Sequence, residues 1–395
     1  MKEGWEYKKI KDIGLVIGGT TPNTNIAEYW DGNLCWISPA ELDGSHYLYD
    51  SRKKITEAAV KAKSLRLLPE GTVILSSRAP IGKVVINKVP TYCNQGFKCV
   101  VCDKEIYNEF LYWWFWGKTE YLNSLGTGAT FKEISKKVVE EITIPVPPLS
   151  EQQSIVDYLD SAFAKIDAMK ANAEKALNEA KALFQASLKK MLEPKEGWEK
   201  NKLGDLVIFF SGYAFESKRY TNNNDDVLLI CGDNIVHCDF RWETIKHWPK
   251  EEYEDLKRFS LEKNDIVLAM DRPWVKSGLK IAKISPKELP SLLIQRTACI
   301  RTPKDISSDF IFYALQTDKF IKYLVSMQTG VGVPHISGKQ ILSYTISIPK
   351  YIEQQTIVTT LDSLKSKVDK LQENYDKISQ ECDALKQAIL RQVFE

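Results

Sequence analysis

Seven stretches of the sequence combine arginine, lysine, glutamine, hydroxyl and aromatic side chains, mostly with glycine or proline, a composition typical of loops that reach a partner. In the first half of the chain they are GGTTPNTNIAEYWDG (18–32), SSRAPIGK (76–83) and TGATFK (127–132). In the second half they are SGYAFESKRY (211–220), MDRPWVKSGLK (270–280), QRT (295–297) and TGVGVPH (329–335). Arginine can pair with guanine and glutamine with adenine, while lysine and hydroxyl groups contact phosphates. These stretches are therefore candidate DNA-binding loops, although each of them alone is also typical of a solvated turn.

We predict DNA contacts at residues chosen by side-chain type and loop position. In the first half these are Thr20, Thr21, Ser77, Arg78, Lys83, Gln95, Thr127 and Lys132. In the second half they are Tyr213, Lys218, Arg219, Arg272, Lys276, Gln295, Arg296, Thr329 and His335. The residues expected to read bases are Arg78 with Gln95, and Arg272 with Gln295 and Arg296. For Arg272, a structural ion pair with the neighbouring Asp271 is the alternative.

Catalytic and metal-binding motifs are missing from the sequence. The GKT at 117–119 resembles the end of a phosphate-binding loop, but the earlier glycine that such a loop requires would fall at Tyr112. No NPPY or DPPY motif for amino methyl transfer, no GxSxG and no HExxH occurs, and the four histidines do not cluster. Cys99 and Cys102 form a CxxC without a second ligand pair, which argues against structural zinc. We therefore expect no catalytic, cofactor-binding or metal-binding residue in this chain.

Composition and charge indicate a folded protein without a dominant electrostatic field. The 395 residues, 44% hydrophobic and 27% charged, suit two domains of ordinary size rather than a disordered chain. The formal net charge of +2 excludes a histone-like basic surface but allows a local basic groove. The sequence shows no signal peptide and no run of about 18 apolar residues. Its eight cysteines lie mostly in apolar runs, so we expect a cytoplasmic protein with reduced thiols and no membrane contact.

An internal repeat organises the chain. Three pairs of segments match, namely KEGWEYKKIKDI (2–13) with KEGWEKNKLGDL (195–206), GTVILSS (71–77) with NDIVLAM (264–270), and IPVPPLSEQQSIVDYLDS (144–161) with IPKYIEQQTIVTTLDS (346–363). Candidate loops recur at matching positions between these anchors, which favours a shared function over chance. The repeat predicts two globular parts, each followed by a helix. It also predicts a pseudo-twofold axis that brings the two chain ends together.

The helix that ends each repeat carries an apolar seam. In the second helix apolar residues alternate in steps of four and three, at Ile357, Leu361, Leu364, Val368, Leu371, Tyr375, Ile378, Cys382, Leu385 and Ile389. The same positions shifted by 202 fall in the first helix at Ile155, Leu159, Ala162, Ile166, Met169, Ala173, Ala176, Ala180, Leu183 and Ser187, with Phe184, Leu188 and Met191 taking over at its end. We take Leu159, Ile166, Ala173, Ala180, Leu361, Val368, Tyr375 and Cys382 as the core of this seam.

The two helices are expected to pair antiparallel as a coiled coil. Small side chains of one helix then leave room for large ones of the other, with Ala173, Ala176 and Ala180 opposite Tyr375, Ile378 and Cys382. Ser150 is the expected N-cap of the first helix and Pro194 its end. The alternative is that each helix packs only on its own domain.

The fold class expected from these patterns is α+β, with two pseudo-twofold-related globular DNA-recognition domains separated by a long antiparallel two-helix coiled coil. Short β-branched runs predict a twisted sheet in each globular part, together with one helical segment, at 109–125 and at 309–327. The expected boundaries are a first recognition domain (1–149), a first helix (150–193), a second recognition domain (194–350) and a second helix (351–395).

Several of these motifs resemble one family, the specificity subunits of type I restriction-modification systems. The resemblance rests on the GGTTP opening followed by EYWDG, on GTVILSSRAPIG, on the TG and IS pairs, and above all on IPVPPLSEQQSIV leading into a long helix. It covers the whole chain, twice over. Lys350 and Tyr351 in the second junction, and SGYAFESKRY in place of the GGTTP opening, depart from the pattern of the first repeat, so the two domains should read different half-sites.

The resemblance implies partners and a role. Each of two target recognition domains would read half of a bipartite, asymmetric DNA site, and the helices would set the spacer between the halves. Two modification subunits that methylate adenine N6 would dock on the helices, and nuclease-translocase subunits would join through the methylase. S-adenosylmethionine, ATP and Mg²⁺ would be bound by those partners and not by this chain. The alternatives are a self-contained restriction-methylation enzyme, against which the missing motifs count, and a coiled-coil scaffold that does not bind DNA.

Overall fold

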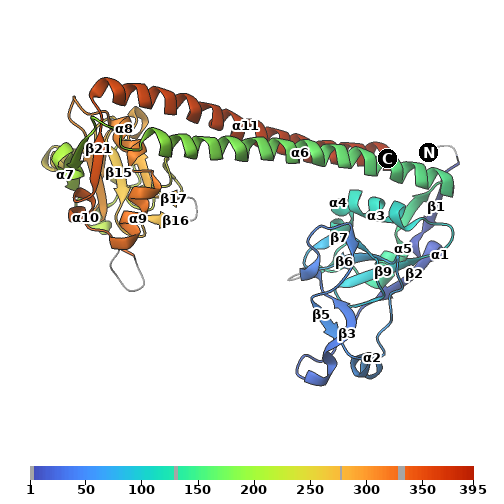
Figure 1. Ribbon diagram of the computed structural model, residues 1–395. Helices are drawn as coiled ribbons and strands as arrows, with labels where there is room; N and C mark the ends of the chain where they lie inside the picture. The colour runs from blue at the N-terminus through green and yellow to red at the C-terminus, as the bar shows by residue number, and fades with distance from the viewer. Residues whose placement is uncertain (1–3, 129–131, 276–277, 328–333) are drawn as a thin grey trace. The chain divides into compact units, whose positions relative to one another are not determined.

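The computed structural model describes residues 4–128, 132–275, 278–327 and 334–395 of the chain. Chain contacts divide it into two compact units, unit 1 with Met1–Glu174 and Tyr375–Glu395, and unit 2 with Lys175–Asn374. Each unit combines a globular part with halves of two long helices, α6 (Leu149–Met191) and α11 (Tyr351–Phe394) (Figure 1). Helix and strand are mixed in both globular parts, so the expected α+β class is confirmed.

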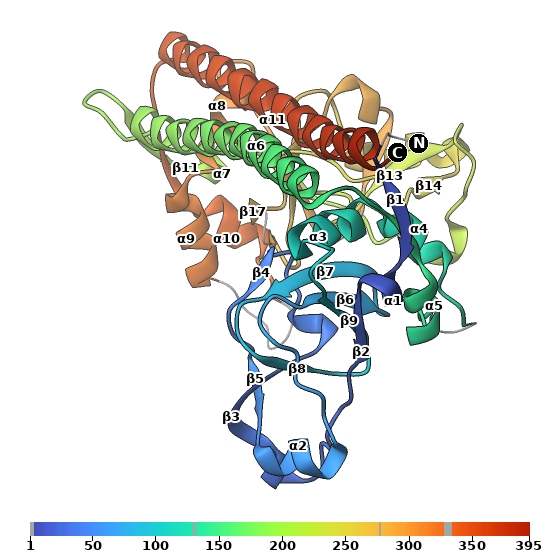
Figure 2. The ribbon, with the colours of Figure 1, turned by 90° about the vertical axis from the view of Figure 1, so that its right-hand side faces the viewer.

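Unit 1 is built on a five-stranded sheet in the order β2-β9-β6-β7-β4, beside a three-stranded sheet β5-β3-β8 and the pair β1-β10. Its strands are β1 (Glu6–Lys9), β2 (Gly14–Gly18), β3 (Trp30–Ile37), β4 (Tyr47–Leu48), β5 (Lys53–Ile55), β6 (Val73–Ser77), β7 (Ile81–Asn87), β8 (Thr91–Cys93), β9 (Phe97–Cys102) and β10 (Thr143–Val146). Its short helices are α1 (Ile10–Ile13), α2 (Glu57–Lys63), α3 (Asn108–Gly117), α4 (Thr119–Ser124) and α5 (Lys136–Glu141). Every residue of β6 is buried because the strand is central, and the aromatic helix α3 lies between the sheet and α6 (Figure 2).

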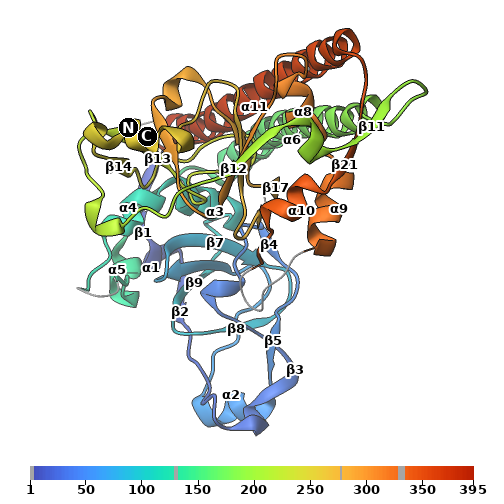
Figure 3. The same ribbon diagram turned by 90° about the vertical axis from the view of Figure 1, so that its left-hand side faces the viewer.

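Unit 2 has a four-stranded sheet in the order β12-β20-β15-β18, a three-stranded sheet β14-β13-β19 and the pairs β11-β21 and β16-β17 (Figure 3). Its strands are β11 (Glu199–Lys202), β12 (Ile208–Ser211), β13 (Val227–Ile230), β14 (His247–Trp248), β15 (Ile266–Ala269), β16 (Trp274–Val275), β17 (Gly278–Leu279), β18 (Ile281–Lys283), β19 (Ser291–Leu293), β20 (Thr297–Arg301) and β21 (Thr345–Ile348). Its short helices are α7 (Leu203–Leu206), α8 (Ser308–Ala314), α9 (Asp318–Met327) and α10 (Gly338–Leu342). The order of the four strands in this sheet repeats that of β2-β9-β6-β7 in unit 1, and the parallel pair β13-β19 matches β3-β8, while β4 of unit 1 and the pair β16-β17 of unit 2 have no counterpart among the strands of the described residues.

One hydrogen bond in each unit joins two of the repeated sequence motifs, KEGW and EQQ, and explains why both motifs recur. In unit 1 the indole of Trp5 donates to Glu151 Oε1 at 2.8 Å, and in unit 2 that of Trp198 donates to Glu353 Oε1 at 3.3 Å. Each bond ties the start of a repeat to the first turn of its long helix. The KEGW and EQQ motifs therefore meet in both units.

The buried first glutamine of each EQQ motif, Gln152 or Gln354, fixes the junction between globular part and helix. Gln152 accepts from the Tyr107 backbone N–H at 2.7 Å and donates to the Pro147 carbonyl at 2.8 Å and the Glu105 carbonyl at 3.0 Å. Gln354 accepts from Ser307 N–H at 2.9 Å and donates to the Pro349 carbonyl at 2.9 Å. A primary amide serves here because it supplies donor and acceptor at once inside a site closed to water.

The long helices run antiparallel where they touch. In unit 1, Lys170 pairs with Asp383 at 3.5 Å, and the Cys382 thiol lies 3.8 Å from the carbonyl of Ile166. In unit 2, Lys181 donates to Gln372 at 2.7 Å. Lys386 pairs with Asp167, so residue numbers on α11 fall from 386 to 383 as those on α6 rise from 167 to 170, and the expected antiparallel pairing is confirmed.

The buried positions of α6 differ from half of the expected seam. Met169 and Leu183 are 59% and 60% exposed, and Ala176 is also exposed. The neighbouring Phe163 and Leu177 are buried instead, whereas Phe184 and Leu188 are buried as the sequence pattern predicted for the end of this helix. The buried positions therefore step by four and then three after Leu159, because the phenylalanine rings remove more apolar surface from water than the alanines beside them. Leu159 and Ile166 are buried, while Ala173 and Ala180 are half-buried.

On α11 the seam follows the sequence pattern as far as Cys382. Leu361, Val368 and Cys382 are buried and Tyr375 is half-buried. Beyond that point Leu385 is exposed, and burial passes to Leu390 and Phe394, which join the core of unit 1. A 3.6-residue period drifts off a 3.5-residue register over this length, which accounts for the change.

Three local expectations are wrong. Ser150 is not an N-cap, because α6 begins at Leu149 and the N–H groups of Glu151 and Gln152 bond to the Pro148 carbonyl. The helix ends at Met191, three residues before Pro194. Each expected internal helix is two helices, since α3 and α4 break at Lys118, where φ and ψ are −108° and 24°, and α8 and α9 break between Ala314 and Asp318. None of the helices in the described ranges is both long and apolar enough to cross a membrane.

Candidate nucleic-acid interface

Three segments of unit 1 meet where strand β6 ends. Ser77 N–H donates to the Gly96 carbonyl at 2.8 Å, before the start of β9, and Ser77 O accepts from Ile134 N–H at 3.0 Å. Thr127 and Glu133 exchange two backbone hydrogen bonds at 3.1 and 2.9 Å. These bonds hold residues 77–80, 94–96, 127–128 and 132–134 together, and we call this set loop cluster 1.

The charged centre of loop cluster 1 is Glu133, which sequence reasoning missed. Its carboxylate lies 3.1 Å from Lys98 Nζ and 3.6 Å from Arg78 Nη1. Lys98 is buried and also donates to Ser77 Oγ at 3.0 Å and to the Gln95 carbonyl at 3.3 Å. The Arg78 guanidinium is one-third exposed, so Glu133 holds it in place while leaving part of its donor edge open to a ligand.

Gln95 is positioned from outside the cluster. Thr21 donates its hydroxyl to Gln95 Oε1. The side chain of Gln95 is exposed, and within the described residues its amide NH₂ donates no hydrogen bond. A glutamine whose carbonyl is occupied and whose NH₂ is open presents donors to a partner.

The other candidates of unit 1 play different parts. Ser77 is fully buried and accepts from Lys98, so its hydroxyl holds the loop. Lys83 donates its ammonium to the Leu42 carbonyl at 2.7 Å, away from the cluster. Thr20 engages its backbone with Cys93 and with the Trp36 indole. The side chains of Thr127 and Lys132 are exposed.

The same backbone arrangement is found in unit 2, where strand β15 ends. Met270 N–H donates to the Arg296 carbonyl and Met270 O accepts from Ile336 N–H, both at 2.9 Å. Arg272 N–H donates to the Pro334 carbonyl at 2.8 Å, and Gln295 N–H donates to Tyr213 O at 2.7 Å. We call residues 213, 270–273, 294–297 and 334–336 loop cluster 2.

Asp271 is the charged centre of loop cluster 2. Its two carboxylate oxygens lie 2.6 Å from His335 Nδ1 and 2.7 Å from Arg296 Nη1. Partial burial raises the pKa of Asp271, but the hydrogen bonds from Arg296 and His335 outweigh burial and hold that pKa below its usual value. The carboxylate therefore stays ionised and orients both neighbours.

Arg272 does not form the ion pair with Asp271 that was the sequence-based alternative, because Arg296 and His335 take both oxygens. Its backbone adopts a left-handed conformation with φ of 43°, and Arg296 does the same with φ of 63°. Such conformations cost about 1–2 kcal/mol for a residue with a side chain and are concentrated at functional sites. The Arg272 side chain is exposed, and no partner for its guanidinium lies within the described residues.

Of the remaining candidates of unit 2, two lie in loop cluster 2, two lie outside it, and two lie outside the described residues. Arg219 forms an ion pair with Glu252 and lies over the Trp248 ring at 4.6 Å, so its charge is already used within the fold. Lys218 is exposed and pairs with Glu216 at 2.9 Å. Tyr213 and Gln295 are exposed at the cluster. Lys276 and Thr329 lie outside the described residues.

The eight cysteines are free thiols, of which five are buried, namely Cys93, Cys99, Cys231, Cys299 and Cys382, and three are half-buried. Cys93 and Cys99 lie 3.6 Å apart, sulfur to sulfur, and burial raises the pKa of Cys102 to about 12. Within the described residues, no group of three or more histidine, cysteine or acidic side chains could hold a metal ion. The CxxC at Cys99 and Cys102 is thus part of strand β9, where burial keeps the Cys102 thiol protonated.

Both units gather polar segments where a central strand of the main sheet ends, an arrangement typical of loops that recognise a partner. A family model described as the type I restriction modification DNA specificity domain matches residues 2–179 and again 195–380. The chain therefore belongs to the type I restriction-modification specificity family, and the resemblance seen in its motifs is confirmed. Specificity subunits are recognition components, so the expectation of a non-catalytic chain is confirmed by family membership.

Curated and solved relatives agree with this assignment. The specificity subunit of the type I restriction enzyme MjaIX from Methanocaldococcus jannaschii is 32% identical over 370 residues, which cover 87% of this chain and 83% of that protein. A solved chain of a type I R-M system superposes with a TM-score of 0.80 at 18% identity, over 100% of this chain and 98% of that one. The HsdS subunit from Thermoanaerobacter tengcongensis gives 0.62 at 16% identity, over 100% and 97%. At these identities the two structures bear on the fold alone.

Proposed function

We propose that the chain reads a bipartite, asymmetric DNA site in the cytoplasm, one half-site through residues 1–149 and the other through residues 194–350. The observation that carries the proposal is that loop clusters 1 and 2 share one backbone arrangement and carry different charged side chains. Two domains that bind different base sequences need different polar side chains on a similar backbone, because each base pair presents its own pattern of hydrogen-bond donors and acceptors.

Five side chains are proposed to read bases. They are Arg78 and Gln95 in loop cluster 1 and Arg272, Gln295 and Arg296 in loop cluster 2. All five lie at the cluster edges with part of their polar surface open. Lys132, Thr127 and Tyr213 are exposed around them, which suits contacts with phosphate or sugar.

The two long helices are proposed to set the spacer between the half-sites and to dock two adenine-N6 methylase subunits. Large apolar side chains stand exposed on α6 and α11, among them Tyr158, Met169, Leu183 and Ile352. Apolar residues on the solvent side of a helix are typical of surfaces that partners cover. Nuclease-translocase subunits would join through the methylase, and those partners would bind S-adenosylmethionine, ATP and Mg²⁺.

The direct test is a methylation map. The chain is co-expressed with the modification subunit of its own system in a host free of other methylases, and methylated adenines are located by single-molecule sequencing. We expect one bipartite motif that disappears when this chain is omitted. A map that is the same with and without the chain would exclude it as the reader.

An insertion tests the spacer role separately. Four residues inserted near Ala173 add about 6 Å of helical rise, and four is one of the steps that a heptad seam absorbs. We expect the preferred spacer to lengthen by about one or two base pairs, because a base pair rises about 3.4 Å, while both half-sites stay the same. An unchanged spacer would show that the helices do not measure it.

A further inference from the structure

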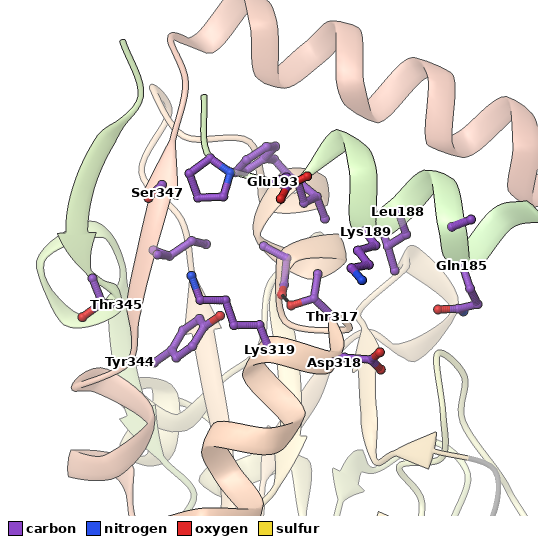
Figure 4. Close-up of a pocket in the computed structure, with 16 residues that line it drawn as sticks. Gln185, Leu188, Lys189, Glu193, Thr317, Asp318, Lys319, Tyr344, Thr345 and Ser347 are labelled. Atoms are coloured by element: carbon purple, nitrogen blue, oxygen red, sulfur yellow. Dashed lines mark hydrogen bonds between the residues drawn. The ribbon is translucent and has the colours of Figure 1, made fainter. Parts of the chain in front are cut away.

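Unit 2 contains a pocket of about 470 Å³ beside the end of its part of α6 (Figure 4). It is lined by residues 185–194 at the end of α6 and just beyond it, by residues 314–319 around the break between α8 and α9, and by β21. Pockets that hold small organic ligands span about 300–1,000 Å³ and combine apolar walls with a few polar groups. The cavity therefore has the volume of a binding site.

Two hydrogen bonds establish which residues of unit 1 match the cavity. Trp113 donates from its indole to Asp160 at 2.9 Å in unit 1, and Tyr313 donates from its hydroxyl to Asp362 at 2.6 Å in unit 2. Residue 113 therefore corresponds to residue 313, and the next position is Trp114 in unit 1 and Ala314 in unit 2. A buried indole in one unit is replaced by a methyl group that lines the cavity in the other.

The end of the long helix makes a second difference. In unit 1, Phe394 packs on Phe110 with ring centroids 5.5 Å apart, and Lys118 pairs with Glu395 at 2.8 Å across the same corner. The matching residues of unit 2 are Leu192, Asp318 and Glu193, so a smaller side chain replaces the phenylalanine and two carboxylates replace the ion pair. Aromatic rings fill this corner and an ion pair seals it in unit 1, and both are missing from unit 2.

The cavity is apolar inside and has charged side chains of both signs at its edge. We call its apolar part beside Ala314 the slot. Leu188, Phe310 and Ile346 give it apolar walls. In Figure 4, Lys319 extends across the cavity beside Tyr344, and Lys189 and Glu193 lie above it. No ion-pair partner for either lysine is found in the described part of the chain.

We propose that this cavity binds a small zwitterionic aromatic compound of the size of an aromatic amino acid. Its ring would take the space that Trp114 fills in unit 1, its carboxylate would meet the ammonium of Lys319, and its ammonium would meet Glu193 or Asp318. The site is independent of the DNA-reading clusters, so the test does not depend on the proposed function.

The test uses the full-length chain and 5-fluoro-L-tryptophan, observed by ¹⁹F NMR, with neutral indole as the second probe. We expect saturable binding of the amino acid to the natural chain. Ala314→Trp places the unit 1 residue in the slot and should weaken binding by more than about tenfold while leaving the melting temperature equal or higher. Lys319→Ala should weaken the amino acid several-fold and leave indole unchanged.

The matched control is Trp114→Ala, which opens the corresponding slot in unit 1. Among the residues that the structure describes, the Trp114 indole N–H has no hydrogen-bond partner, so we expect the variant to lose packing alone. It should gain a second indole site without a second site for the amino acid, because Lys118 and Glu395 stay paired. Should Ala314→Trp not fold, Ala314→Leu serves in its place. Absence of binding to the natural chain at millimolar ligand, or binding unchanged in the slot-filling variant, would overturn the proposal.

Discussion

Loop clusters 1 and 2 share one backbone arrangement, but the positions of their acidic and basic side chains are exchanged. Arg78 in cluster 1 occupies the position of Asp271 in cluster 2, since each follows a residue that bonds to both neighbouring segments, Ser77 or Met270. Opposite Arg78 lies Glu133, and opposite Asp271 lies His335, with a backbone bridge between each pair. In both clusters an acidic side chain lies opposite a basic one. The basic residue is the one that follows the strand in cluster 1 (Arg78), and the acidic residue is the one that follows it in cluster 2 (Asp271).

The second cation also comes from a different place in each cluster. In cluster 1 it is Lys98, a buried residue of β9, whose counterpart in β20 is Ala298. In cluster 2 it is the exposed Arg296, whose counterpart is Gly96. A Cβ at Gly96 would lie 2.9 Å from the Pro39 ring and 3.0 Å from Asn94 Oδ1, so cluster 1 has no room for a side chain there. Main-chain hydrogen bonds thus fix the scaffold, and the charged positions vary on it without disturbing the fold.

The largest expected effect concerns what the two units share, the buried glutamine at the helix junction. Gln152→Leu leaves one N–H and two carbonyl groups without the partner that Gln152 provides. The substitution should therefore lower the free energy of local unfolding by about 3 kcal/mol. Gln354→Leu removes two bonds and should cost about 2 kcal/mol. Native-state hydrogen exchange of each unit measures both values.

The exposed neighbours Gln153 and Gln355 give matched controls for this comparison. The same substitution there should change protection by less than about 0.5 kcal/mol, as is usual for exposed sites. Equal losses at buried and exposed positions would show that the junction is not held by the amide network.

The next effect separates the two readers. Arg78→Ala should relax the first half-site and leave the second unchanged, and Arg272→Ala should do the reverse, each at about 1–3 kcal/mol of discrimination. Methylation maps of both variants, made with the partner subunits, measure this. Weaker methylation of every site with the motif intact would assign the residue to a phosphate contact instead.

The repeat in the sequence predicted the two units, their mixed composition and the antiparallel helices, because hydrophobic period and repeated anchors are local signals. It did not predict which face of α6 is buried, since Phe163 and Ala162 both continue the seam and only packing in three dimensions selects the larger ring. It also missed Glu133 and Lys98, which are far apart in sequence and meet only when the chain folds so that Glu133 lies beside β9.

The candidate sites show the same limit. Arg78 and Gln95 were predicted from residue type and lie in one cluster, whereas Arg219 has the right type and is occupied by Trp248 and Glu252. Residue type identifies possible contacts, but burial and existing partners decide which remain open. A signal for Glu133 was available, because it precedes the repeated Ile-Ser pair at the position that His335 holds in the second repeat.

A smaller difference is expected from the two second cations. Lys98→Ala removes a buried ammonium that bonds to Glu133, Ser77 and the Gln95 carbonyl, and should destabilise unit 1 by about 1–2 kcal/mol. Arg296→Ala removes a side chain that is 68% exposed and leaves His335 on Asp271, so its cost should stay below about 1 kcal/mol. Thermal unfolding of the two variants under one condition compares them. A larger loss from Arg296 than from Lys98 would mean that burial does not govern these pairs.

The smallest expected effect is the acid sensitivity of cluster 2. Asp271 has a folded-state pKa held below its ordinary value by Arg296 and His335, against the opposing effect of burial. A carboxyl group of this kind contributes stability above its unfolded pKa of about 3.9, and loses it as the pH falls through the lower folded pKa.

Asp271→Asn should therefore lower the stability of unit 2 by less than about 1 kcal/mol at pH 7, and by the same amount at pH 5, with the difference vanishing only below about pH 4. Denaturant unfolding of both proteins between pH 3 and pH 7 checks the curve. If the difference were lost already between pH 7 and pH 6, a carboxyl group with a lowered pKa would not account for it, and Asp271 would not be what organises this cluster.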